Sequence, residues 1–239
     1  MAQEGETGRQ IKGVIKFAPE GYPFIVWFLF ITGILSVLLF WNWKTGSGSF
    51  SFYLLFVLYF ISLSLTSFMA FFFRDPERKI PEGKGLFVSP ADGEVILIGD
   101  IHERNYLYED TKEISIFMSP FDVHVNRAPC DGKVSVVKYS PGKYMAAYKK
   151  ESSLKNENIV MVLDGDKDRV VVRQVAGFLA RRAVCRVKPG DTLRRGERYG
   201  IIKFSSRLDV YLPKDADIKV KLGDKVKAGE TVIAVDSRL

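Results

Sequence analysis

Two adjacent hydroxyls, Ser205 and Ser206, are the residues whose place in the chain most favours chemistry. Ile201 and Ile202 precede the pair and the run Val210-Tyr211-Leu212 follows it, so the pair lies between two apolar segments that predict strands. A serine pair between strands is either a polar turn, for which serine is a common residue, or a nucleophile. A serine hydroxyl attacks a carbonyl carbon efficiently only when a neighbouring base takes its proton.

The sequence offers two histidines as that base, His102 and His124. His102 stands in a charged loop and is expected to be solvated. His124 lies within Met118-Ser-Pro-Phe-Asp-Val-His-Val-Asn-Arg-Ala-Pro129, a stretch dense in groups that can orient an imidazole. A lone histidine in a strand is more often a structural residue, but this setting makes His124 the candidate base.

Two long apolar stretches predict a pair of membrane helices. Residues 21–43 and 45–73 carry no charged side chain, and Lys44 alone separates them. Each exceeds the ~20 residues that a helix needs to cross the hydrocarbon core of a bilayer. We therefore predict a transmembrane α-hairpin over residues 21–73, with residues 41–49 as its turn and two tryptophans of that turn at the membrane surface. A hydrophobic hairpin buried in a soluble core is the alternative.

The charges that flank these stretches predict the orientation of the hairpin. Basic residues gather on both outer flanks: Arg9, Lys12, Lys16, Arg74, Arg78, Lys79 and Lys84. The connecting turn holds only Lys44. Because positively charged flanks favour the cytoplasmic side, we expect both ends of the chain in the cytoplasm and the soluble domain on the cytoplasmic side of the cell membrane.

The formal net charge of +7 fits a domain that lies against anionic lipid headgroups. Nucleic acid would explain the same charge, but two membrane spans and the lack of a dense Lys/Arg run argue against nucleic-acid binding. Cys130 and Cys185 are the only cysteines, and in a cytoplasmic domain we expect both to be free thiols.

Residues 74–239 predict one all-β domain, long enough for a single core. Short β-branched runs recur along it, separated by Gly, Pro and Asp at spacings typical of a sandwich or barrel. These runs are residues 94–98, 114–117, 134–137, 159–163, 170–173, 183–187, 199–203 and 231–235. A short helix is expected within residues 144–155.

Two internal repeats favour a barrel-like sandwich built from similar hairpins. Val187-Lys-Pro-Gly-Asp191 recurs as Val220-Lys-Leu-Gly-Asp224, and Ser89-Pro-Ala-Asp-Gly-Glu-Val95 is echoed by Ala128-Pro-Cys-Asp-Gly-Lys-Val134. Gly-Asp turns suit tight connections in which one residue adopts a positive φ. Lipoyl and biotinyl carriers use hairpins of this kind, but the Met-Lys-Met motif of those carriers has no equivalent in this sequence.

Four motifs, in this order, resemble the phosphatidylserine decarboxylases, in the short, pyruvoyl-dependent form of that family. They are Ser89-Pro-Ala-Asp-Gly-Glu-Val95, Met118-Ser-Pro-Phe-Asp-Val-His-Val-Asn-Arg127, Arg173-Gln-Val-Ala-Gly177 with Ala180-Arg-Arg182, and Phe204-Ser-Ser-Arg-Leu-Asp-Val-Tyr-Leu-Pro213. The likeness covers residues 74–239. Four linked motifs make it specific, whereas any one of them alone would be weak.

The resemblance implies a proenzyme that cuts its own chain. By position, Ser206 is the serine that attacks the preceding carbonyl. β-Elimination of the resulting ester, followed by hydrolysis, then leaves a pyruvoyl group on the new chain start. The chain would divide into a β chain, residues 1–205, and an α chain, residues 206–239, which stay associated. Residues 1–20 would form a cytoplasmic segment, residues 21–73 the membrane anchor and residues 74–239 the catalytic domain.

The resemblance also implies an Asp-His-Ser arrangement, to which Asp92, His124 and Ser206 correspond. An imidazole can take the hydroxyl proton while a carboxylate holds its tautomer. The pyruvoyl carbonyl can form a Schiff base with the substrate amine and accept the electrons left when CO2 departs, which is the role of a bound cofactor. No metal or pyridoxal site is visible in the sequence. His124 is the candidate acid that returns a proton to the product.

Three cations are the candidate ligands of the substrate phosphate or carboxylate: Arg127, Lys143 and Arg207. A plain surface charge is the alternative for each of them.

Two positions depart from the family pattern. Ser205 stands where a glycine usually precedes the reactive serine, and a serine at positive φ would cost on the order of 1 kcal/mol, which would slow or block the cut. Arg127 stands where larger members carry a second histidine. Either His124 serves both maturation and turnover, or another group serves one of them.

The sequence therefore predicts a membrane-anchored carboxy-lyase that converts phosphatidylserine to phosphatidylethanolamine and CO2, or archaetidylserine to archaetidylethanolamine if the headgroup stands on an archaeal ether lipid. Its expected partners are the phospholipid, the membrane, its own α and β chains, and a second copy in a homodimer. The alternatives are a non-catalytic membrane adaptor with a lipoyl-like domain, and a paralogue that does not process itself.

Overall fold

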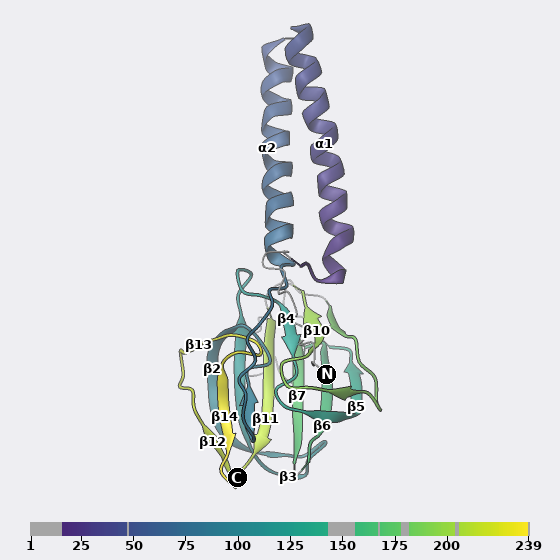
Figure 1. The fold of residues 1–239 in the computed structure, drawn as a ribbon. Helices are drawn as coiled ribbons and strands as arrows, with labels where there is room; N and C mark the ends of the chain where they lie inside the picture. The colour runs from purple at the N-terminus through teal and green to yellow at the C-terminus, as the bar shows by residue number, and fades with distance from the viewer. Residues whose placement is uncertain are drawn as a thin grey trace, which may run out of the picture.

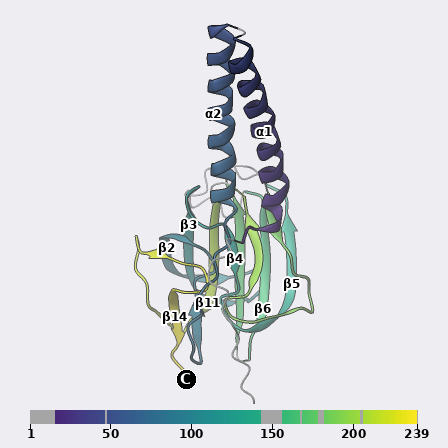
Figure 2. The same cartoon turned by 45° about the horizontal axis from the view of Figure 1, so that its top comes forward.

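In the computed structural model, two long apolar helices stand on one end of a mostly-β domain (Figure 1). The structure describes residues 16–46, 48–142, 156–166, 168–177, 182–203 and 206–238. A short 3-10 helix, η1 (Pro19–Gly21), leads into α1 (Tyr22–Thr45), and α2 (Ser49–Phe72) follows. The two helices lie side by side in both views (Figures 1 and 2), as the predicted hairpin requires.

Both helices expose large apolar side chains. Trp27, Phe30 and Phe60 are 61 %, 61 % and 62 % exposed. In water, that exposure is unfavourable by roughly 25 cal/mol for each Å² of apolar surface, and contact with hydrocarbon removes the penalty. Each helix is long enough and apolar enough to cross a bilayer. These features support association with a membrane over the alternative of a hairpin buried in a soluble core.

The turn between the helices is shorter than the sequence predicted. Helix α1 continues to Thr45, so Trp41 and Trp43 lie on its last turns and not in the connection. Gly46 ends the helix in the left-handed conformation, with φ of 64°, and its amide donates to the carbonyl of Asn42 at 3.1 Å. The helix ends there because a residue without a Cβ adopts this conformation at little cost.

The rest of the described chain folds into strands, and every β-branched run singled out in the sequence overlaps one of them. The strands are β1 (Leu86–Val88), β2 (Gly93–Glu103), β3 (Glu109–Met118), β4 (Val125–Arg127), β5 (Gly132–Ser140), β6 (Asn158–Asp164), β7 (Arg169–Ala176), β8 (Ala183–Cys185), β9 (Thr192–Leu193), β10 (Arg198–Ile202), β11 (Ser206–Pro213), β12 (Ala216–Ile218), β13 (Lys225–Val226) and β14 (Val232–Asp236). The helix expected within residues 144–155 lies outside the described residues.

These strands form one eight-stranded antiparallel sheet, in the order β13-β2-β3-β11-β7-β6-β5-β9, and two three-stranded sheets, β1-β14-β12 and β4-β10-β8. The large sheet curls into a half-barrel (Figure 1). The prediction of two apolar helices followed by a mostly-β domain is confirmed. The closer likeness to lipoyl and biotinyl carriers stays a prediction.

Strand β11 runs through the middle of the large sheet, between β3 and β7. Side chains along a strand alternate between the two faces of its sheet. Leu208, Val210 and Leu212 belong to the main hydrophobic core, and Ser206 shares their face of the strand. Arg207 lies on the opposite face. The strand that begins at the candidate nucleophile is thus also a central element of the fold.

A second hydrophobic cluster joins the helices to the β domain. It contains Ala18, Ile25, Phe72, Phe73, Val123, Val125 and Ile201. The backbone reinforces this contact, because the amide of Ala18 donates to the carbonyl of Phe73 at 2.8 Å. The hairpin is therefore packed against the domain at its base and is more than a tether.

The two repeated Gly-Asp turns adopt the same geometry, as the sequence repeat indicates. The amide of Gly190 donates to the carbonyl of Val134 at 2.8 Å, and the amide of Gly223 donates to the carbonyl of Val95 at the same distance. Both glycines have positive φ, 101° and 87°, which a residue with a Cβ rarely adopts. Each turn thus closes against the start of a long strand of the large sheet, β5 or β2.

Candidate active site

Ser206 begins strand β11 and is completely buried. Its backbone pairs with Met118 on β3 and with Ala176 on β7, so the residue is held from both sides. Its Oγ donates a hydrogen bond to the Sδ of Met118 at 3.3 Å. Phe204 and Ser205 lie outside the described residues, so the effect of Ser205 on the bond before Ser206 stays a prediction.

His124 lies immediately before β4, and its side chain is completely buried. Its Nδ1 lies 2.9 Å from the backbone carbonyl oxygen of Asp122. Because a carbonyl oxygen only accepts, Nδ1 carries the proton and Nε2 keeps a lone pair. Nε2 has no hydrogen-bond partner among the described residues. The imidazole is therefore held in the tautomer that leaves Nε2 as a proton acceptor.

The electrostatic environment keeps this imidazole neutral. Burial lowers the pKa of His124 to about 4, because the charged form would lose its hydration. Asp122 raises the pKa of His124, through its carbonyl and its charge, and Arg74 lowers it further. At pH 7, His124 is thus available as a base, and a proton that it donates must be one that it has just accepted.

Asp92 is buried as well, and its carboxylate is already engaged. Nη2 of Arg78 donates to Oδ1 and Oδ2 of Asp92 at 2.9 and 2.7 Å, and the amide of Ala228 donates to Oδ1 at 2.8 Å. Burial raises the pKa of Asp92, while the neighbouring Arg78 guanidinium acts to lower it. Asp92 is thus bonded to Arg78, and it is the carbonyl of Asp122 that holds the tautomer of His124.

Ser206 and His124 lie in one region of the fold, although no hydrogen bond joins their side chains. Met118, which accepts from Ser206, also accepts from Nδ2 of Asn126 at 3.9 Å, two residues after His124. The amide of Ile202, four residues before Ser206, donates to the carbonyl of His124 at 3.4 Å. A direct contact between Ser206 Oγ and Nε2 of His124 would require the serine to release Met118.

Asp92 approaches the same end of strand β3. It precedes Gly93, where an added Cβ would lie 2.1 Å from the backbone oxygen of Phe117, one residue before the end of that strand. Only glycine permits so close an approach of two backbones. The charge of Asp92 acts to raise the pKa of Arg74, and the charge of Arg74 in turn acts to lower the pKa of His124. The three predicted catalytic residues therefore share one neighbourhood without forming a hydrogen-bonded chain.

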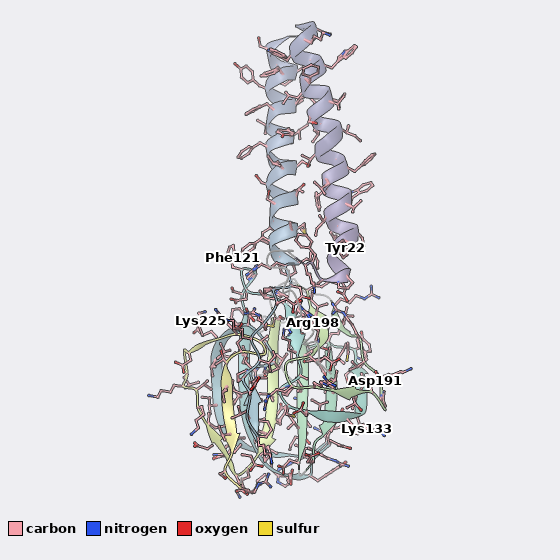
Figure 3. The ribbon with its side chains drawn as sticks, in the orientation of Figure 1. Tyr22, Phe121, Lys133, Asp191, Arg198 and Lys225 are labelled. Atoms are coloured by element: carbon pink, nitrogen blue, oxygen red, sulfur yellow. The ribbon has the colours of Figure 1, made fainter. Side chains whose placement is uncertain are left out.

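This neighbourhood lies at the end of the β domain that faces the helices. Figure 3 shows Tyr22, at the start of α1, and Phe121, three residues before His124, at the base of the hairpin. Nη2 of Arg74, two residues after the end of α2, donates to the carbonyl of Phe121 at 2.7 Å. The loop that leads to His124 is thus tied to the helix end.

Arg127, one of the predicted substrate ligands, is buried and held by the backbone. Its Nη1 donates to the carbonyl of Gly196 at 2.9 Å, and its Nη2 donates to that of Pro76 at 3.0 Å. Nη2 also lies 3.4 Å from Oδ1 of Asp75. Lys143, the second predicted ligand, lies outside the described residues.

Arg207, the third predicted ligand, is only 2 % exposed and faces away from Ser206. Its Nε lies 2.5 Å from Oδ1 of Asp209, and its Nη2 donates to Oγ of Ser115 at 2.7 Å. Glu113 lies 3.6 Å from the same Nη2. The guanidinium therefore serves a buried ion network on the other face of the sheet.

Sequence reasoning missed several residues that complete the site. Asp122 and Met118 stood within a motif already singled out, but nothing in the sequence identified a backbone carbonyl or a sulfur as the partner. Arg78, the partner of Asp92, was read only as a flanking charge. Phe72, the last residue of α2, packs its ring on that of His124 with centroids 4.1 Å apart, and no spacing links these residues.

Comparison with known proteins places the chain in one family. A family model described as phosphatidylserine decarboxylase matches residues 65–234, which take in the end of α2 and nearly all of the β domain. The chain is 45 % identical over 219 residues to a phosphatidylserine decarboxylase proenzyme of Geotalea uraniireducens (strain Rf4), with 91 % of this chain and 95 % of the relative covered.

Two further relatives bear the same name, phosphatidylserine decarboxylase proenzyme. One, from Syntrophus aciditrophicus (strain SB), is 42 % identical over 215 residues, which cover 90 % of this chain and 94 % of the relative. The other, from Desulfotalea psychrophila (strain LSv54 / DSM 12343), is 45 % identical over 178 residues, which cover 74 % of this chain and 83 % of the relative. The similarity thus extends well beyond the short motifs.

Proposed function

Because this chain belongs to the phosphatidylserine decarboxylase family, we propose that it is a carboxy-lyase that converts phosphatidylserine to phosphatidylethanolamine and CO2 through a pyruvoyl group made from Ser206. The reaction takes place on the serine headgroup. It therefore does not distinguish a diacyl lipid from archaetidylserine, whose backbone is an archaeal ether lipid.

The observation that carries the proposal at the site is the state of His124. Its Nδ1 donates to the carbonyl of Asp122, and its buried Nε2 keeps a lone pair with no partner among the described residues. A buried polar atom without a partner is costly to maintain, and such atoms often mark sites of function. A neutral imidazole whose Nε2 lone pair has no partner among the described residues is the base that activation of Ser206 requires.

The first step is the cut that creates the pyruvoyl group. Ser206 Oγ attacks the carbonyl carbon of Ser205 while Nε2 of His124 takes the hydroxyl proton, and the acyl group passes from nitrogen to oxygen to form an ester. Loss of the Cα proton of residue 206 breaks its Cβ–O bond and leaves a carboxylate on Ser205. Water then replaces the nitrogen of residue 206, which departs as ammonia, and the new chain start carries a ketone.

Asp92 enters the proposal as an electrostatic partner of His124. When His124 takes the proton, a positive charge forms near Arg74; the carboxylate of Asp122 offsets that charge, and Asp92 offsets the charge of Arg74. Asp92 is tied to Arg78 by two hydrogen bonds. A direct hydrogen bond from Asp92 to the imidazole would first have to break that pair.

The residues around position 206 fit a pyruvoyl group. Met118 and Ala176 pair with the backbone there from both sides, so the end of the cut strand stays in register, and burial keeps bulk water away. The ketone supplies an acceptor for the electron pair that CO2 leaves behind. Because its pKa is about 4, His124 would first take a proton at Nε2 from the ammonium group of the substrate and would then return it to the product carbon.

The ligand of the substrate phosphate is part of the same proposal. Arg127 and Arg207 would each have to leave a buried ion pair to bind a phosphate, and one partner of such a pair is strongly destabilised when it is left alone. Lys143 lies outside the described residues, so it stays a candidate ligand on the sequence alone.

We also propose how the protein is organised around this reaction. Residues 21–73 anchor it in the cell membrane with the catalytic domain, residues 74–239, on the cytoplasmic side, and residues 1–20 precede the anchor there. The cut separates a β chain, residues 1–205, from an α chain, residues 206–239. A homodimer is expected from the family resemblance alone.

The test is the intact mass of the freshly purified protein. The parent chain should give two fragments that meet at the bond between Ser205 and Ser206, the smaller one blocked to Edman degradation. Ser206→Ala should give one full-length, inactive chain. Ser205→Gly is the matched control, because it removes the neighbouring hydroxyl and leaves the nucleophile, and it should be cut at the same bond.

An uncut parent chain with full decarboxylase activity would refute the pyruvoyl mechanism. An uncut, inactive parent chain that becomes cut and active in Ser205→Gly would support the alternative of a paralogue that Ser205 keeps from processing. An uncut, inactive chain in both cases would favour the non-catalytic adaptor.

A further inference from the structure

The end of a membrane helix forms one wall around the candidate base. Phe72 is the last residue of α2 and is completely buried, and its ring lies on the imidazole of His124 with centroids 4.1 Å apart and planes at 36°. The last residue of the anchor thus contacts the side chain to which the chemistry is assigned.

The surroundings of Phe72 explain why its ring has a fixed position. Phe73 packs against it edge to face, with centroids 5.0 Å apart, and Phe68 contacts it from the preceding helical turn at 6.2 Å. Val125 and Ile201 of the β domain belong to the same hydrophobic cluster. The position of Phe72 is thus determined by the helices and by the β domain together.

The imidazole of His124 has charged groups around it, and the side that packs on Phe72 is its apolar side. Asp122 lies on the same loop as His124. Arg74 follows the end of α2, and its guanidinium lies 3.8 Å from the ring centre of Phe71 and donates to the carbonyl of Phe121 at 2.7 Å. On the neighbouring strand β10, Arg198 is held by Asp75 at 2.7 Å. On this side the imidazole packs on the ring of Phe72, and both side chains are completely buried.

We propose that Phe72 is a positioning residue for His124, so that the membrane hairpin is a structural part of the active site as well as its anchor. The ring holds the imidazole plane with Nδ1 on the Asp122 carbonyl, and it excludes water from Nε2. The proposal rests on the function proposed for His124. It adds that the base is assembled only when α2 is docked on the β domain.

A smaller side chain at position 72 has a direct physical consequence. Water would reach the imidazole, the charged form would regain hydration, and the pKa of His124 would rise from about 4 toward its ordinary value near 6.5. Below that pKa, Nε2 carries a proton and cannot accept one. The acid limb of the pH–rate profile should therefore move to higher pH.

The experiment compares Phe72→Leu with Phe73→Leu in the full chain, in detergent micelles. Phe73 is equally buried and belongs to the same cluster, and its ring packs on those of Phe24 and Phe72. The first readout is the nitrogen-15 spectrum of histidine-labelled protein. Only two histidines are present, so His102→Gln assigns both signals. The second readout is decarboxylation of phosphatidylserine against pH.

In the parent chain, the His124 signal should stay in its neutral, Nδ1-protonated form down to about pH 4. Phe73→Leu removes a neighbour of Phe72 but leaves the Phe72 ring on the imidazole, so the titration of His124 should stay much closer to the parent value than in Phe72→Leu. In Phe72→Leu, the His124 signal should titrate at higher pH, and the acid limb should shift with it. Phe72→Tyr keeps the aromatic face and should restore the parent behaviour, and it also serves if the leucine variant fails to fold. Equal spectra and pH profiles in the parent, Phe72→Leu and Phe73→Leu would overturn the proposal.

The two proposals fail in different ways. If His124→Gln is cut and decarboxylates normally while Phe72→Leu still shifts the titration of His124, the contact is real and the proposed catalytic role of His124 is wrong. If His124→Gln is inactive but Phe72→Leu leaves the titration and the acid limb unchanged, the role of His124 stands and the inference about Phe72 is wrong.

Discussion

At the scale of single residues, the two neighbours Ser206 and Arg207 have opposite tasks because a strand directs them to opposite faces. Ser206 lies toward the core and contacts Met118, whereas Arg207 is fixed by Asp209 and Ser115 on the other side. Charge-assisted hydrogen bonds are stronger than neutral ones, so this network holds Arg207, the residue after Ser206, firmly in place. We infer that it keeps residue 206 in place after the cut.

Removing the guanidinium of that network should be costly. Arg207→Met removes the ion pair between Arg207 and Asp209 from a buried network, and breaking a buried pair typically destabilises a protein by about 3–5 kcal/mol. We expect a large fall in the unfolding midpoint and less complete self-cleavage, measured by thermal unfolding and intact mass. Arg169→Met is the control, because Arg169 makes its ion pair with Asp164 at the surface and should change stability little. Equal effects of the two changes would contradict this account.

The base itself should respond to removal and to pH in a defined direction. His124→Gln should slow self-cleavage by roughly 100- to 10,000-fold, the usual range for loss of a general base. Because burial lowers the pKa of His124 to about 4, protonation removes the base only as the pH falls toward that value. Cleavage of chain made by cell-free synthesis, followed against pH, should show no loss near pH 6.5. His102→Gln, which changes an exposed histidine, should behave as the parent.

At the scale of elements, hydroxyl groups join the two membrane helices. Oγ1 of Thr32 lies 2.7 Å from Oγ of Ser62 and 3.0 Å from Oγ1 of Thr66, and all three residues are buried between the helices. Apolar side chains gain little from packing against each other inside a bilayer, since lipid tails are equally apolar. Such polar contacts therefore set the register of one helix on the other.

Thr32→Val should weaken the hairpin modestly. It removes two interhelical contacts, and each is worth roughly 0.6 kcal/mol in membrane proteins, so a loss of about 1 kcal/mol is expected in unfolding by sodium dodecyl sulfate. Ser64→Val is the control, because Ser64 donates only within its own helix, to Phe60 at 2.8 Å. A smaller loss for Thr32→Val than for Ser64→Val would show that the hydroxyls do not join the helices.

Strands were predictable where hydrophobic runs are long, and poorly predictable where pairing alone creates them. Val170-Val-Val and Val134-Ser-Val-Val are rich in β-branched residues and lie in β7 and β5 as expected. Strand β13 has two residues and exists because Lys225 and Val226 pair with the start of β2. No local pattern encodes such a strand, because its hydrogen bonds join residues far apart in the chain.

At the scale of the whole molecule, the bond to be cut lies within one folded domain. The piece that begins at Ser206 contains β11, β12, β13 and β14. Strand β11 pairs with β3 and β7, β13 pairs with β2, and β14 pairs with β1, all of which precede the cut. The two chains that the proposed cut would produce are therefore joined by sheet hydrogen bonds and by a shared core.

The two chains should accordingly stay together after the cut. Under native conditions in detergent, size exclusion should give one species that contains both fragments, and denaturing electrophoresis should separate them. Dissociation should coincide with global unfolding, because removal of β11 would open the centre of the large sheet. Release of the small chain well below the unfolding midpoint would argue against a shared core.

The sequence by itself determined the apolar hairpin, the mostly-β domain and the family, and it supplied the candidate reactive groups, because hydrophobic patterning and motif chemistry are local properties of the chain. Tertiary structure alone decided which partners these groups have. Asp92 is bonded to Arg78, His124 donates to the carbonyl of Asp122, and the imidazole lies under Phe72. Those contacts join segments that only folding brings together, and they determine both the tautomer of the base and its pKa.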